Sequence, residues 1–77
     1  MNNKRRSTLL QLAVPLLQKA SDYVSQVLDV EEDALDNIPE NLCGSERYEK
    51  IESAIYNLED AIDSIDNAKE SIEAAAE

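Results

Sequence analysis

Several residues on which catalysis and metal binding depend are absent or rare in this sequence. It has no histidine, a single cysteine and a single glycine. It therefore lacks histidine-based motifs, spaced cysteine ligands and a glycine-rich phosphate loop, and no serine stands in a nucleophile motif. Carboxylates paired along one helix also lack the Glu-x-x-His pattern of di-iron bundles. We therefore expect a protein that is not an enzyme and that has no catalytic residues, metal site or cofactor.

Large aromatic residues and cysteine pairs, which stabilise many small domains, are missing as well. The 77 residues include no tryptophan or phenylalanine, and the lone Cys43 excludes a disulfide within the chain. One free thiol is typical of a reducing cytoplasm. A single core of this size contributes only about 3–5 kcal/mol, so small domains commonly self-associate. The sequence predicts one cytoplasmic domain over residues 1–77 that forms a homo-oligomer, a dimer or larger.

Long hydrophobic runs and an excess of positive charge are also lacking. No segment approaches the roughly 18 consecutive apolar residues of a membrane span. The apolar run Leu9–Leu17 follows a basic start, but no small-residue cleavage site of a signal peptide comes after it. The formal net charge of −10 opposes binding to nucleic acids and to anionic lipids. We expect neither a membrane nor a nucleic acid as a direct partner, and instead a basic or locally basic one.

What the sequence contains instead is helical periodicity. Apolar residues recur at helical spacing from about residue 7 to residue 37, and they fill four of the seven heptad columns. One partner helix cannot bury so wide a stripe, which indicates contact with a second chain as well. Pro15 removes a backbone hydrogen bond and clashes with the carbonyl of Gln11, so the helix is expected to be kinked or split there.

A second helix is predicted from about residue 46 to residue 76 by an internal repeat of seven residues. Residues 38–45 hold Pro39 and Gly44, which are strong signals of a turn, and Ser45 is placed to cap the second helix. Because so short a turn forces the helices to run antiparallel, the predicted fold class is all-α: a coiled-coil-like two-helix hairpin that associates into a helical-bundle oligomer. The oligomer core is expected to contain Leu10, Leu17, Val24, Val27, Ile51, Ile55, Leu58, Ile62, Ile65 and Ile72. A column of small residues beside that core consists of Ala54, Ala61, Ala68 and Ala75.

Polar groups, an aromatic ring and two positive charges lie together at the turn and at the start of the second helix. A helix N-terminus with free amide groups, a serine hydroxyl and an arginine can hold a phosphate or a carboxylate. The competing interpretation is structural, with Ser45 as a cap, Tyr48 at the end of the core and Arg47 paired with a neighbouring acid. If this site is functional, its ligand-binding residues are Asn41, Leu42, Ser45, Arg47, Tyr48 and Lys50.

An acidic ridge runs along one face of the second helix, at intervals of three, four or seven residues. Its members are Glu49, Glu52, Glu59, Asp63, Asp66, Glu70, Glu73 and Glu77. Such an array resembles the phosphates of a nucleic acid and would fit the basic groove of a host protein. The contacts to that protein would come from Glu52, Glu59, Asp63, Asp66, Glu70 and Glu73. The alternative is a solvated face that keeps a small oligomer soluble.

A basic tip, Lys4 to Arg6, opens the first helix. In an antiparallel hairpin this tip lies near the acidic end of the second helix, residues 73–77, and a simple charge match explains it. If chains stack antiparallel, the tip would instead approach the turn of another subunit. There it would complete a positive pocket around Arg47 and Lys50.

The turn also carries a resemblance to a known group of proteins. The stretches Pro39-Glu40-Asn41-Leu42 and Ser45-Glu46-Arg47-Tyr48, with the heptads after them, resemble small helical-hairpin proteins encoded by phages and conjugative elements of Gram-positive bacteria. The similarity spans roughly residues 33–66, and Cys43 stands where glutamine is expected.

Small phage proteins of this size often serve in counter-defence, either by sequestering a nucleotide immune signal inside an oligomer or by blocking a host protein. The resemblance thus implies a phage or mobile-element protein that sequesters a small anionic, nucleotide-like signal in the cytoplasm of a bacterial host. An acidic inhibitor of a basic host protein and a purely structural assembly module are the alternatives.

Overall fold

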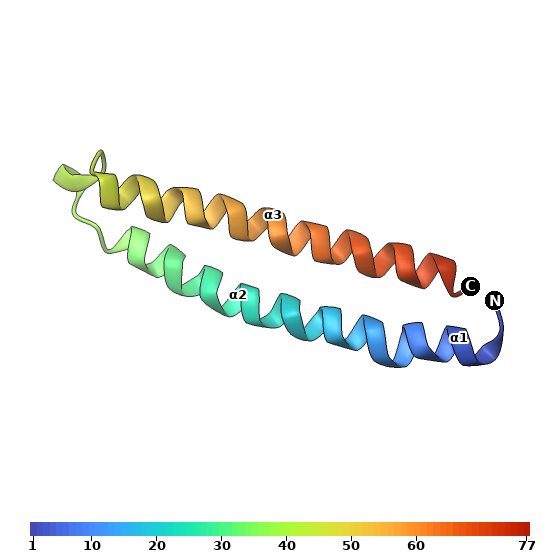
Figure 1. Cartoon of the computed structure of the whole chain (residues 1–77). Coiled ribbons are helices and arrows are strands. Elements are labelled where there is room, and N and C mark those ends of the chain that lie inside the picture. Colours follow the sequence, from blue (N-terminus) through green and yellow to red (C-terminus); the bar gives the residue numbers. More distant parts are fainter.

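The computed structural model describes residues 1–77 and consists of helices and the turns that connect them. In chain order its elements are α1 (Asn3–Thr8), the π-helical turn η1 (Leu9–Ala13), α2 (Val14–Asp36), the 3-10 turn η2 (Glu40–Leu42) and α3 (Glu46–Ala75). The run of α1, η1 and α2 lies antiparallel to α3, and the two chain ends lie together at the end opposite the turn (Figure 1). The predicted all-α hairpin is therefore confirmed, whereas its association into an oligomer stays a prediction.

The first helical run begins at Asn3 rather than near residue 7, because a side chain caps an earlier turn. The Oδ1 atom of Asn2 accepts a hydrogen bond from the backbone N–H of Arg5 at 2.8 Å. Before Pro15 the helix does not break but widens into η1, where the N–H of Val14 donates to the carbonyl of Leu9. Proline has no backbone N–H and cannot donate to the carbonyl four residues before it. A π-helical turn holds one extra residue and changes which carbonyls are paired there. The helix thus passes the proline without interruption.

The connection between α2 and α3 is held by its own backbone hydrogen bonds. Pro39 is extended, and the N–H of Leu42 donates to its carbonyl at 2.8 Å. The N–H of Ser45 donates in turn to the carbonyl of Leu42 at 3.0 Å. The Oγ atom of Ser45 accepts from the N–H of Tyr48 at 3.2 Å, so the predicted cap of the second helix is present.

Two apolar seams run along α2, and only one of them faces α3. The inner seam contains Leu17, Ser21, Val24, Leu28, Glu31 and Leu35, which are all buried or half-buried. Its counterpart on α3 contains Tyr48, Ile51, Ile55, Leu58, Ile62, Ile65 and Ile72, which are also buried or half-buried. Residues of both seams recur at alternating steps of three and four, as in a coiled coil, except between Ile65 and Ile72, where half-buried Lys69 occupies the intervening position. Leu10 and Val27, which the sequence places in the core of an oligomer, are exposed in the single hairpin.

The hairpin is long and thin, and its core is correspondingly small. It measures 59 × 15 × 13 Å, and its radius of gyration is 17.4 Å, against about 11–12 Å for a compact chain of this length. Only Ser21, Ile55 and Ala76 are buried. None of the helices has the sustained hydrophobicity that a transmembrane segment requires. Each helix therefore covers one side of the other and leaves its remaining surface open.

Candidate functional site

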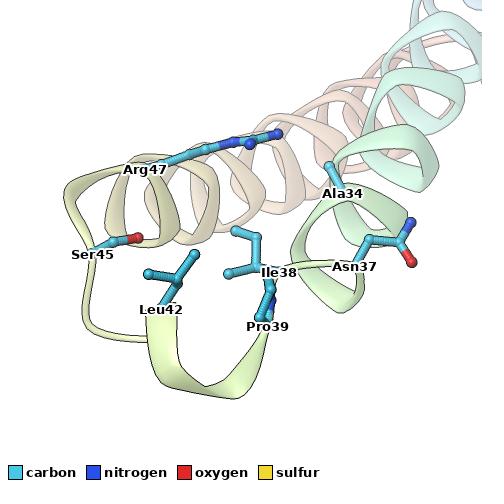
Figure 2. Close-up of a pocket in the computed structure, with 7 residues that line it drawn as sticks. All are labelled: Ala34, Asn37, Ile38, Pro39, Leu42, Ser45 and Arg47. Carbon is cyan, nitrogen blue, oxygen red and sulfur yellow. The ribbon is translucent and has the colours of Figure 1, made fainter.

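A pocket opens at the turn end of the hairpin, where the end of α2 lies beside the start of α3. Its volume is about 420 Å³. In Figure 2, Ile38 and Leu42 point into the space below the extended side chain of Arg47, whereas the amide of Asn37 points away from them. The residues that line this turn pocket are Ala34, Asn37, Ile38, Pro39, Leu42, Ser45 and Arg47.

The chemistry of the turn pocket is divided between an apolar floor and a polar rim. Ala34, Ile38 and Leu42 contribute methyl and methylene groups, and Leu42 is about half exposed, at 48%. Ser45 contributes a hydroxyl and Arg47 a guanidinium at the N-terminal, positive end of the α3 dipole. Such a surface suits a small molecule that combines a flat apolar part with an anionic group.

The two basic side chains at the start of α3 differ because Lys50 forms an ion pair and Arg47 does not. The Nζ atom of Lys50 lies 3.1 Å from a carboxylate oxygen of Glu46, and this is the only ion pair in the chain. Arg47 therefore has no carboxylate within 4.0 Å, although the chain carries 17 acidic residues. A second, shallower depression of about 410 Å³ lies between Glu46, Arg47, Lys50 and Ile51. Arg47 borders both spaces, so it is the cation that an anionic ligand would meet.

The structure gathers only part of the predicted ligand-binding set. Leu42, Ser45 and Arg47 line the turn pocket, and Lys50 lines the neighbouring depression with Arg47. Asn41 lines neither space.

Tyr48 is half-buried on the face of α3 that packs on α2. Partial burial and the nearby carboxylate of Glu52 raise the pKa of Tyr48 above its ordinary value of 10.0. Tyr48 lines neither the turn pocket nor the neighbouring depression.

Sequence reasoning missed the contribution that the last turn of α2 and the residues just after it make to the pocket. Ala34, Asn37, Ile38 and Pro39 line it, yet none of them was singled out as a ligand contact. The signal was available, because antiparallel helices with a short connection necessarily place the last turn of one beside the first turn of the other.

The residues of the acidic ridge follow one side of α3, with Glu77 just after its end, and none of them forms an ion pair within the chain. Glu52 is half-buried and the other members are exposed. No lysine or arginine lies within 4.0 Å of any of its carboxylates, since the only ion pair joins Lys50 and Glu46. Like charges at this spacing repel by a few tenths of a kcal/mol per pair. The ridge therefore lowers the stability of the isolated helix.

The basic tip lies at the end of α3, as the antiparallel arrangement predicts, but it makes no ion pair there. The Nε atom of Arg6 donates to the carbonyl oxygen of Ala76, and its Nη1 atom donates to the side-chain oxygen of Asn3 at 3.3 Å. Lys4 and Arg5 are exposed and have no side-chain partner. The contact between tip and end is thus a hydrogen bond to the backbone rather than a match of opposite charges.

Comparisons with known proteins do not assign this chain to a family. No protein-family model matches it, and neither the curated proteins nor the solved structures contain a significant match. The geometry of the turn pocket and of the helix surfaces is therefore the basis for the functional proposal.

Proposed function

We propose that this chain is a non-enzymatic, phage or mobile-element binding protein that captures a small anionic, nucleotide-like ligand at the turn end of its hairpin. Ligand capture is supported above all by the position of Arg47, a cation without an acidic partner at the edge of the turn pocket. The origin and a role in counter-defence are supported by the resemblance of the turn to phage and conjugative-element hairpin proteins.

The unpaired state of Arg47 favours an anion from outside the chain. Five other basic side chains of the chain also lack an ion pair, so Arg47 is distinguished by its place at the rim of the turn pocket and at the start of α3. A guanidinium offers parallel donors that fit a phosphate or a carboxylate, and it does so best where no internal acid competes. The free amide groups at the start of α3 attract the same class of ligand.

The apolar floor of the turn pocket favours a ligand that is more than an inorganic ion. Ala34, Ile38 and Leu42 offer it only van der Waals contact. The volume of about 420 Å³ falls in the range of roughly 300–1,000 Å³ that is typical of small-molecule sites. A nucleobase or a comparable flat ring on the floor, with its phosphate at Arg47, satisfies both parts of the pocket.

Native mass spectrometry of the protein purified from cells tests the proposal, because it reports retained small molecules directly. We expect additional mass on the wild-type chain and its loss in Arg47→Ala, with affinity reduced about 10- to 100-fold. Arg47→Lys keeps the charge without the parallel donors, so its retention should be intermediate. Glu59→Gln changes one charge on the acidic ridge, outside the pocket, and serves as the matched control.

The same experiment can exclude the pocket. Equal retention by wild type and Arg47→Ala, or loss of the ligand in Glu59→Gln as well, would contradict ligand capture at the turn.

The unneutralised acidic ridge supports a second candidate function, the inhibition of a basic host protein. Mimicry of a nucleic acid predicts binding that weakens steeply as the salt concentration rises. It also predicts that the double substitution Glu59→Gln and Asp66→Asn reduces binding while Arg47→Ala leaves it unchanged. These outcomes are the reverse of those expected for ligand capture. A purely structural module would respond only to changes in the apolar seams.

A further inference from the structure

A second apolar seam on α2 has no partner within the hairpin. It is formed by Leu16, Ala20, Tyr23, Val27, Val30 and Ala34, which follow one another at alternating steps of four and three residues. The exposed fractions are 68% for Leu16, 58% for Tyr23, 51% for Val27 and 63% for Val30. This outer seam has the same coiled-coil spacing as the inner seam that packs on α3. Its geometry therefore fits a long helix rather than an irregular surface.

The hairpin exposes more surface than a compact protein of its size. The accessible surface is 5626 Å², against about 4,700 Å² for a compact folded protein of 8.6 kDa. The excess is close to the roughly 800 Å² that each partner contributes to a standard protein–protein interface.

We propose that a second copy of this chain packs antiparallel on the outer seam, related to the first by a two-fold axis. The alternating spacing allows a register in which Leu16 faces the partner's Ala34 and Ala20 faces the partner's Val30. In the same register Tyr23 faces the partner's Val27, and each contact occurs twice by symmetry. Large side chains then face smaller ones, as the core of an antiparallel coiled coil requires.

The charges that flank the outer seam select the antiparallel orientation. Lys19, Gln26 and Asp33 form the column beside it, and Lys19 is the only basic residue of α2. In the proposed register Lys19 lies beside the partner's Asp33, and the two Gln26 side chains meet near the two-fold axis. In a parallel pairing each residue of this column would instead face the partner residue five positions further along, so Lys19 would lie beside the partner's Val24 and Asp33 beside the partner's Ile38, with no pair of opposite charges. Only the antiparallel copy is complementary in charge.

The dimer also brings a second set of cations to the turn. In this register Val14 of the partner faces Asp36 at the end of α2, so the partner residues before it, including Lys4 and Arg5, extend past α2 on the side of the turn. The pocket adjoins the outer seam, because Ala34 belongs to both. That the partner's cations take part in ligand capture rests on the proposed function, whereas the dimer itself does not.

Sedimentation equilibrium of the full chain tests the outer seam. We expect a dimer for wild type and a dissociation constant at least about tenfold higher for Tyr23→Glu, with unchanged helical circular dichroism, because Tyr23 is exposed in the hairpin. Tyr56→Glu introduces the same change at an exposed tyrosine of α3, outside the seam, and should leave the dimer intact. A wild-type monomer at micromolar concentration, or equal masses for wild type and Tyr23→Glu, would overturn the proposal.

Exchange of the flanking charges tests the orientation. Lys19→Asp and Asp33→Lys each place like charges opposite one another, so each should weaken the dimer about two- to fivefold. The double variant restores two opposite pairs and should regain the wild-type dissociation constant. If the double variant is as weak as the single ones, the antiparallel register is wrong.

A short bis-maleimide reagent tests the same register through the native Cys43, which is exposed. Within one hairpin, positions 5 and 43 lie near opposite ends of a molecule 59 Å long, so only a link between chains can join them. We expect covalent dimers for Arg5→Cys and none for wild type or for the mid-helix control Asp22→Cys. Linked wild-type dimers, or an Arg5→Cys variant that stays monomeric, would contradict the arrangement. Ligand retention is measured separately, so a dimer without ligand refutes the proposed function alone.

Discussion

The Nε atom of Arg6 donates a hydrogen bond to the carbonyl oxygen of Ala76 at 2.6 Å, and this contact joins the start of α1 to the end of α3. The carbonyl is one of those at a helix C-terminus that have no partner further along the helix. A positive guanidinium is also favourable at the negative end of the α3 dipole. The contact therefore closes the open end of the hairpin, opposite the turn.

Removal of this contact should loosen the open end. We expect Arg6→Ala to lower the free energy of unfolding by about 1–2 kcal/mol, because it removes a charged hydrogen bond to a buried residue. The amides of the last turn of α3 should exchange faster with solvent. Arg5→Ala is the control, since that exposed side chain makes no hydrogen bond, and it should change stability by less than about 0.5 kcal/mol. Urea unfolding at one fixed protein concentration measures both.

The cap of α3 should contribute a similar amount. Ser45→Ala removes the acceptor of the Tyr48 N–H and should destabilise the fold by about 1 kcal/mol. Ser45→Asp supplies another acceptor and should retain stability. Ser53→Ala, at an exposed position inside the same helix, controls for the loss of a hydroxyl elsewhere. Equal stability of wild type and Ser45→Ala in thermal unfolding would show that the cap contributes nothing.

Replacement of the only glycine of the chain should make the fold more stable. Gly44 does not have a positive φ, and a Cβ added there meets no atom within 4 Å. Gly44→Ala should therefore raise the free energy of unfolding by about 0.4–1 kcal/mol, chiefly because the unfolded chain has fewer conformations. A decrease in the midpoint of urea unfolding would indicate that the turn needs the freedom of glycine.

Because the pKa of Tyr48 is raised, the free energy of unfolding should depend on pH in the alkaline range. Because the folded state holds this proton more tightly than the unfolded state, stability is unaffected well below pH 10 and falls as the pH rises past about 10. We expect this part of the loss to disappear in Tyr48→Phe, which keeps the ring and removes the ionisable group. Urea unfolding of both proteins on either side of pH 10 gives the comparison. Parallel losses in both would contradict the assignment.

Local features of the two helices could be predicted from the sequence because each depends on residues that are close together along the chain. The isoleucine and leucine columns of α3 recur every seven residues, and that period alone predicts one apolar face. Ser45 follows a turn with proline and glycine, so its role as a cap depends only on the residues after it. Pro15 was expected to kink or split the first helix, whereas the structure has a π-helical turn before it and continues through it, a form that depends on which backbone carbonyls find partners.

The sequence by itself therefore determined an all-helical hairpin, its turn and its charge, because hydrophobic period, capping and turn chemistry act over a few residues. Only the tertiary structure decided which two of the four apolar columns of α2 face α3, and so which seam stays exposed. It also decided that Ala34 and Ile38 complete the pocket below Arg47. Both outcomes depend on how the two helices rotate and slide against each other, and that choice is made by side-chain packing between residues far apart in the chain.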